Sequence, residues 1–175
     1  MKSKKQKCPV NLVGQREVTV LQDGRIKLPA DVLGTLRSVS RASRTLYPGR
    51  IPLTKALILC PKLLWNRWKR DLQSQFPSLQ THPGTAAYLN PFKPVNWDRQ
   101  GRIFLPAEAN QFAAIPHSTA IILIGKEYYL ELWSETEFNK AIAQCDAALQ
   151  ELDPLPEDKR SKEDTHTRAG GGRTP

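Results

Sequence analysis

Residues that usually mark metal sites are scarce in this chain of 175 residues, which has only three cysteines and three histidines. Cys8, Cys60 and Cys145 lie too far apart in the sequence for zinc-finger spacing, and the histidines are equally isolated. We therefore expect no metal site, and cysteines that stay as free thiols in a reducing cytoplasm. The sequence also lacks any run of about 18 apolar residues, so we expect no membrane span.

The patterns that mark enzymes are missing as well. No nucleophile is paired with a base, no two carboxylates are placed to share a pocket, and no glycine-rich phosphate loop occurs. We therefore expect a protein that is not an enzyme, with no cofactor and no small-molecule substrate.

Positive charge is abundant and unevenly distributed. The chain carries 26 Lys and Arg against 17 Asp and Glu, a net charge of +9. Residues 1–80 hold 16 of the basic residues and 4 of the acidic ones, whereas residues 81–152 hold 5 and 8. A strongly basic half favours polyanionic partners, because phosphate neutralisation releases counterions. The distribution therefore favours nucleic acid as a partner over a surface that is basic only for solubility.

One segment of the sequence occurs twice. The eight residues GRIKLPAD at 24–31 return as GRIFLPAE at 101–108, with a constant offset of 77 and a change at only two positions. A repeat of this quality predicts two copies of one structural unit, because neither copy is expected to bury its apolar face alone. The repeated element is a turn that exposes an arginine rather than a catalytic pocket.

In the first copy we expect a strand near residues 17–21, a turn, and a second short strand at residues 26–28. A short helical turn should follow and close near Gly34. Residues 37–50 contain four arginines among Ser, Thr, Pro and Gly, and we expect a loop there. A short strand at residues 56–60 and an amphipathic helix come next, and the Trp65 and Trp68 side chains of that helix should lie in the core.

The second copy predicts a β-hairpin between residues 121 and 133. Ser134 and Glu137 form a capping box for a helix that should stop at Asp153-Pro154. These patterns divide the chain into a basic disordered arm, a first repeat, a proline-rich linker without regular structure, a second repeat and a disordered tail, at residues 1–15, 16–75, 76–94, 95–152 and 153–175.

The repeated Gly-Arg-Ile-x-Leu-Pro motif resembles the SpoVT-AbrB type of DNA-binding element. Two tandem copies, each followed by a hairpin and a helix, resemble the MraZ family of bacterial regulators, which are encoded with division and cell-wall genes. The second copy carries the Asp-x-x-x-Arg signature of that family intact, at Asp98 and Arg102. The first copy departs from it, because Leu21 stands at the aspartate position and the nearest acid is Asp23.

The resemblance implies an α+β fold in which two tandem AbrB-like swapped-hairpin repeats form one pseudo-symmetric domain, each repeat followed by a helix. It also implies a homo-oligomer, ring-like in form, that binds repeated boxes of double-stranded DNA near a promoter. We therefore expect a transcriptional regulator that is cytoplasmic and associated with the nucleoid.

The two turns contain the candidate site residues. A glycine before the arginine permits a positive φ, and an aspartate four residues before it is able to pair with the guanidinium and orient it. The expected DNA contacts are Arg25, Lys27, Arg99 and Arg102, and the expected turn and orienting residues are Asp23, Gly24, Asp98 and Gly101. Alternatively, the aspartate and arginine only stabilise the turn.

Two further alternatives stay open. An AbrB-type antitoxin, or a protein-interaction module whose tail or linker holds a partner protein, is the alternative function. The arginines of residues 37–50 form either a second phosphate-binding loop or a solvated surface, and their position relative to Arg25 distinguishes these two cases.

Overall fold

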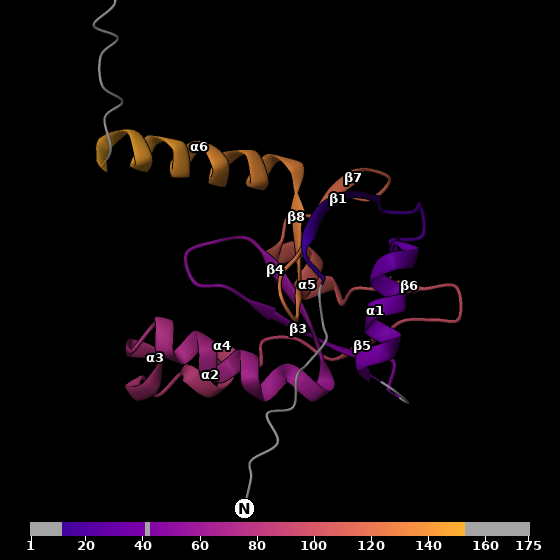
Figure 1. The fold of residues 1–175 in the computed structure, drawn as a ribbon, viewed down its shortest axis with the longest axis horizontal. Helices are drawn as coiled ribbons and strands as arrows, with labels where there is room; N and C mark the ends of the chain where they lie inside the picture. Colours follow the sequence, from indigo (N-terminus) through magenta and orange to yellow (C-terminus); the bar gives the residue numbers. More distant parts are fainter. Residues whose placement is uncertain (1–11, 41–42, 153–175) are drawn as a thin grey trace, which may run out of the picture. The chain divides into compact units, whose positions relative to one another are not determined.

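The computed structural model describes residues 12–40 and 43–152 of the chain. The predicted tail, and all but four residues of the predicted basic arm, lie outside the described residues. The chain divides into two units, Met1–Ala141 and Ile142–Pro175. Figure 1 labels most of the helices and strands along the chain.

The first unit contains two antiparallel sheets. The larger has the strand order β1-β7-β8-β4-β3-β5. Its strands are β1 (Gly14–Thr19), β3 (Thr45–Arg50), β4 (Leu57–Pro61), β5 (Val95–Asn96), β7 (Ala120–Gly125) and β8 (Leu130–Ser134). The smaller sheet pairs β2 (Arg25–Lys27) with β6 (Arg102–Phe104). Together with the helices, these sheets confirm the predicted α+β class.

Strands are shared between the two halves of the sequence. β1 belongs to the first copy, yet it pairs with β7 of the second copy, from Gly14 opposite Gly125 to Thr19 opposite Ala120. β5 belongs to the second copy and pairs with β3 of the first. β4 and β8 join the two halves at the centre of the sheet. Each copy therefore supplies strands that the other copy needs to complete the sheet.

The helices are mostly short. They are α1 (Ala30–Ser40), the 3-10 helix η1 (Lys62–Leu64), α2 (Trp65–Gln75), α3 (Ser78–Thr81), α4 (Thr85–Leu89), α5 (Ala107–Phe112) and α6 (Glu135–Leu152). Helix α1 continues through Gly34, so the prediction of a short turn closing there is wrong. Burial of Val32, Leu33 and Leu36 along one face of α1 outweighs the cost of about 1 kcal/mol for an interior glycine.

The prediction of a loop at residues 37–50 is also wrong. Its first residues complete α1, and its last six form β3, where Tyr47 stacks on Trp65 with ring centroids 5.5 Å apart. Gly49 gives the tryptophans room, because a Cβ there would lie 2.8 Å from Trp68 and 2.9 Å from Trp65. Both indole rings are buried, as the helical spacing predicts.

The linker between the copies contains the short helices α3 and α4, so the prediction that it lacks regular structure is wrong. Three contacts anchor it. Leu89 is buried, Trp65 Nε1 donates a hydrogen bond of 3.3 Å to Asn90 Oδ1, and Phe92 lies against Phe112 at a centroid distance of 5.8 Å.

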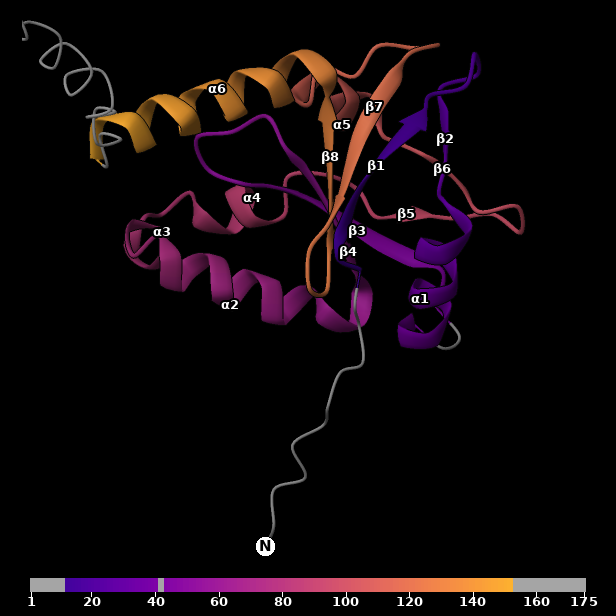
Figure 2. The same cartoon turned by 45° about the horizontal axis from the view of Figure 1, so that its top comes forward.

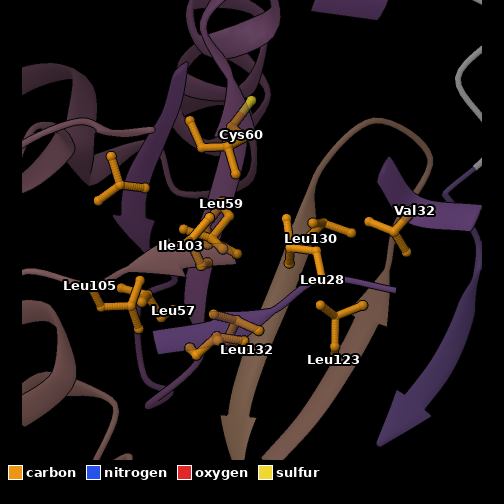
Figure 3. Packing of buried hydrophobic residues seen from close by; sticks show 14 of the residues in the cluster. Leu28, Val32, Leu57, Leu59, Cys60, Ile103, Leu105, Leu123, Leu130 and Leu132 are labelled. Atoms are coloured by element: carbon orange, nitrogen blue, oxygen red, sulfur yellow. The ribbon is translucent and has the colours of Figure 1, made fainter. Parts of the chain in front are cut away.

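The core connects the two sheets. Figure 3 shows Ile103 of β6, Leu59 of β4, Leu130 of β8 and Leu28, which follows β2, in one cluster of buried side chains. All four side chains are fully or almost fully buried. The segments that flank the repeated turns are therefore held by packing against the central strands.

Candidate functional site

The two copies of the repeated motif pair with each other to form a two-stranded ribbon, β2–β6 (Figure 2). In its antiparallel register, Arg25 is opposite Phe104, Ile26 is opposite Ile103, and Lys27 is opposite Arg102. The repeat in the sequence predicts two copies of one unit. The structure adds that their strands are direct neighbours, so the two turns belong to one site.

One face of this ribbon points into the protein and the other points out. Ile26 and Ile103 are fully buried. Since side chains alternate across a strand and opposite residues share a face, the remaining residues project outward. We call this outward surface the ribbon face; it consists of Arg25, Lys27, Arg102 and Phe104.

The two turns have the same backbone geometry. Gly24 and Gly101 both have φ of +77°. In the first turn the Leu21 amide donates to the Arg25 carbonyl at 2.7 Å, and in the second the Asp98 amide donates to the Arg102 carbonyl at 2.9 Å. The turn therefore forms with or without an aspartate at its first position.

Asp98 holds Arg102 in place. Its carboxylate accepts hydrogen bonds from the backbone amides of Gln100 and Arg102, each at 2.9 Å, and from Arg102 Nε at 2.7 Å. The backbone hydrogen bond from Arg102, together with its guanidinium, lowers the pKa of Asp98 below its usual value. The Arg102 side chain is 28% exposed in this pairing. The aspartate that the sequence singles out therefore fixes the direction of its arginine.

In the first turn, Asp23 takes over part of this role. Its Oδ1 accepts the backbone amide of Arg25 at 3.0 Å, and its Oδ2 lies 3.5 Å from Arg25 Nε. The Arg25 side chain is 44% exposed. This longer ion pair holds Arg25 less tightly than Asp98 holds Arg102.

The remaining predicted cations lie apart from the ribbon strands. Arg99 is exposed in the turn between β5 and β6. Arg37 lies on α1, Arg44 immediately precedes β3, and Arg50 ends β3 with its guanidinium 4.1 Å from the centre of the Tyr88 ring. The described arginines of residues 37–50 therefore lie on a helix, on a strand and directly before that strand, rather than together in one loop.

Three further residues near the ribbon were not predicted from the sequence. Arg16 of β1 binds Asp31, the last residue of the first motif, through Nε at 2.8 Å and Nη2 at 2.5 Å. Phe104 and His117 both lie close to Gly24. Phe104 had a signal in the sequence, because it occupies one of the two positions where the copies differ.

A cleft of about 460 Å³ lies between α2 and the β7–β8 hairpin. Arg67 is placed over the Tyr128 ring at 4.3 Å, and the Tyr128 hydroxyl donates a hydrogen bond to Asp71. Burial and this hydrogen bond raise the pKa of Tyr128. The charged side chains in this cleft pair with one another, as Arg67 does with Asp71 and Glu127. This pairing indicates a structural role.

Neither a metal site nor a membrane span is visible in what the structure describes. Within residues 12–40 and 43–152, no three His, Cys, Asp or Glu side chains form a group that could hold a metal ion. Over the same residues, no helix has the length and apolar character needed to cross a membrane.

The fold and the ribbon define a class of protein: an α+β chain with two copies of one strand–turn–strand motif that pair with each other and share a larger sheet. Residues 92–153 match the family model described as "MraZ protein, putative antitoxin-like". The predicted resemblance to the MraZ family is confirmed over this segment.

Curated relatives named Transcriptional regulator MraZ match a larger part of the chain. The protein of Dehalococcoides mccartyi is 29% identical over 147 residues, which cover 82% of this chain and 97% of the relative. The protein of Treponema pallidum is 26% identical over 133 residues, or 72% of this chain and 80% of the relative. The protein of Desulforamulus reducens is 25% identical over 101 residues, or 57% and 70%.

Proposed function

We propose that the protein is a DNA-binding transcriptional regulator of the MraZ type and that the ribbon face contacts double-stranded DNA. The pairing of β2 with β6 carries this proposal, because it gathers Arg25, Lys27 and Arg102 on one outward surface. The transcriptional role is supported by the names of the relatives.

A two-stranded ribbon suits DNA on physical grounds. The major groove of B-DNA is about 12 Å wide and admits such a ribbon. An oriented guanidinium like that of Arg102 is able to make a bidentate contact to guanine or to a phosphate, whereas Lys27 supplies a point charge for a phosphate. Arg99, exposed in the adjoining turn, adds a further phosphate contact in this proposal.

The AbrB-like swapped-hairpin architecture belongs to the same proposal. It is supported by the exchange of β1 and β5 between the copies, since each strand pairs with a strand of the other copy. A pseudo-symmetric ribbon between two such copies presents each repeated turn at one of its ends.

Each ribbon has only three residues in each strand, so one copy of the chain makes few contacts with DNA. We propose that several copies bind repeated promoter boxes together, which raises the affinity through a high effective concentration. Control of division and cell-wall genes is the target that the family resemblance implies.

Helix α6 supports a homo-oligomer. Its apolar side chains recur at alternating spacings of four and three residues, which is the pattern of a helix-pairing seam: Phe138, Ile142, Cys145, Leu149 and Leu152. No residue of α6 is buried, and Ile142, Leu149 and Leu152 are 47%, 54% and 79% exposed. We propose that a second copy of the chain covers this stripe.

A binding measurement on DNA from upstream of the chain's own gene tests the function. The double variant Arg25→Ala/Arg102→Ala should bind at least tenfold more weakly than the wild type, since charged base contacts contribute about 1–3 kcal/mol each. Arg70→Ala together with Lys62→Ala, which removes two exposed cations outside the ribbon, is the matched control and should keep most of the affinity. A double variant that binds as tightly as the control would remove the ribbon from the interface.

The alternative function is an antitoxin or protein-interaction module. The matching family is described as antitoxin-like, which supports this alternative. Two observations together would favour that alternative. The chain would form a stable stoichiometric complex with a small toxin-like protein encoded beside it, and it would not bind duplex DNA.

A further inference from the structure

The ribbon face is chemically unequal at its two ends. Lys27 and Phe104 occupy equivalent positions in the two copies, and they are the only strand residues in which β2 and β6 differ. Through the antiparallel register, Lys27 faces Arg102 at one end of the ribbon, while Phe104 faces Arg25 at the other. One end is therefore purely cationic, and the other combines a cation with an aromatic ring.

Phe104 is an exposed apolar side chain in a polar setting. It is 60% exposed, although both neighbouring strand positions on the ribbon face carry cations. Within the described part of the chain, its ring takes part in no aromatic pair and no cation–π contact. The Phe104 ring therefore makes few contacts within the fold that would stabilise it in this exposed position.

The position of the ring is nevertheless defined. A Cβ placed on Gly24 would lie 3.5 Å from Phe104 Cε2 and 2.8 Å from His117 Cε1. The ring thus lies against the turn of the first copy, immediately before Arg25. An apolar group at this place lies beside Arg25 on the ribbon face.

We propose that Phe104 contacts the C5-methyl group of a thymine in the major groove, so that each ribbon reads an unequal site with thymine at the Arg25 end. This inference rests on the proposed DNA-binding function. Thymine is the only base of ordinary DNA that presents a methyl group in the major groove, and phenylalanine is among the side chains that contact it. Lys27, at the equivalent position, ends in an ammonium group and offers no aromatic surface to a thymine methyl group.

The test compares two duplexes that differ only in methyl groups. The full chain is titrated into a duplex from its own upstream region, and into the same duplex with deoxyuridine in place of every thymidine. The wild type should bind the deoxyuridine duplex about fourfold more weakly for each ribbon that contacts the DNA, the loss expected for about one buried methyl group per ribbon.

Two variants assign this preference to Phe104. Phe104→Ala should bind the thymine duplex about as weakly as the wild type binds the deoxyuridine duplex, and should not distinguish the two. Phe104→Lys makes the two ends alike, so it should lose the preference and steepen the salt dependence by about 0.9 in log K against log salt for each ribbon bound. Leu63→Ala, which trims another exposed apolar side chain away from the ribbon, should keep the preference.

Different outcomes overturn the two proposals. If the wild type binds both duplexes equally, or if Phe104→Ala keeps the preference, the thymine contact is wrong while DNA binding stands. If the wild type binds neither duplex, or if Arg25→Ala/Arg102→Ala binds as well as the wild type, the proposed function of the ribbon fails and the thymine contact fails with it.

Discussion

At the scale of single residues, the two turns differ in how firmly each arginine is held. Asp98 accepts three hydrogen bonds, two from Arg102 and one from Gln100, whereas Asp23 accepts one backbone hydrogen bond and has a longer ion pair with Arg25. The spacing of Asp98 and Arg102 predicts their pairing. The sequence also places Asp23 among the orienting residues, and its contacts with Arg25 depend on the same turn forming around Leu21.

The Asp98 contacts predict a pH dependence of stability. Because the pKa of Asp98 is lowered in the folded state, its contribution is fully present above its usual pKa of 3.8 and is lost as the pH falls through the lower folded value. The free energy of unfolding of Asp98→Asn should therefore fall less steeply than that of the wild type below about pH 4. Urea unfolding at a series of pH values measures this, and equal slopes would show that the carboxylate contributes nothing.

The two turn glycines predict unequal costs for alanine. Both have a positive φ, which costs about 1–2 kcal/mol for alanine. At Gly101, however, the new Cβ would lie 2.0 Å from Leu33 Cδ1 in the core, whereas at Gly24 it meets His117, an exposed side chain that is able to move. Gly101→Ala should therefore lower the free energy of unfolding by at least about 1 kcal/mol more than Gly24→Ala. Urea unfolding of both variants compares them, and equal losses would contradict this packing.

At the scale of elements, the ribbon depends on its buried face. Ile103→Ala should destabilise the protein by about 2–5 kcal/mol, because it leaves a cavity beneath the ribbon, where Ile103 is fully buried. Phe104→Ala, one residue further along the same strand, should change the stability by less than about 0.5 kcal/mol because the ring is mostly exposed. Unfolding midpoints measure both. Similar losses would mean that Phe104 packs in the core.

Elements with a complete local pattern were predictable. The β7–β8 hairpin and the start of α6 follow from alternation, a Gly125-Lys126 turn and the Ser134 cap, whose hydroxyl accepts the Glu137 amide at 3.4 Å. β3 was not predictable in this way, because Pro48 and Gly49 indicate a loop. That strand forms because the Trp65 and Trp68 rings pack beside Gly49, a contact between segments that are distant in sequence.

The structure of the linker was also not predictable from local sequence patterns. Its prolines predict an irregular segment, yet α3 and α4 form between them, held by contacts of Leu89, Asn90 and Phe92 with other parts of the fold. Such anchoring depends on tertiary neighbours, which the composition of a segment does not reveal.

At the scale of the whole molecule, the repeat explains why the two turns form one surface. The sequence predicts two equivalent units, and the exchange of β1 and β5 between them brings both motifs into one ribbon. The contact between the two motifs depends on strand pairing between residues about 77 positions apart in the sequence, which local periodicity does not reveal.

Association through α6 is a prediction at this scale. Ile142→Asp together with Leu149→Asp places two charges in the apolar stripe and should lower the mass measured by light scattering, because a charge buried in such a seam without a partner is costly. Asn139→Asp together with Gln144→Asp adds the same charge outside the stripe and should leave the mass unchanged. A wild type that is already monomeric at micromolar concentration would contradict the proposed oligomer.

The central claim is that the ribbon face binds DNA through its cations. The most direct test is the salt dependence of binding to duplex DNA from the upstream region, measured for the wild type and for Arg25→Ala/Arg102→Ala. If both arginines bind phosphates, the slope of log K against log salt should become shallower by about 1.8 for each bound copy of the chain, or about 0.9 for each phosphate that is no longer neutralised. An unchanged slope together with an unchanged affinity would contradict the account.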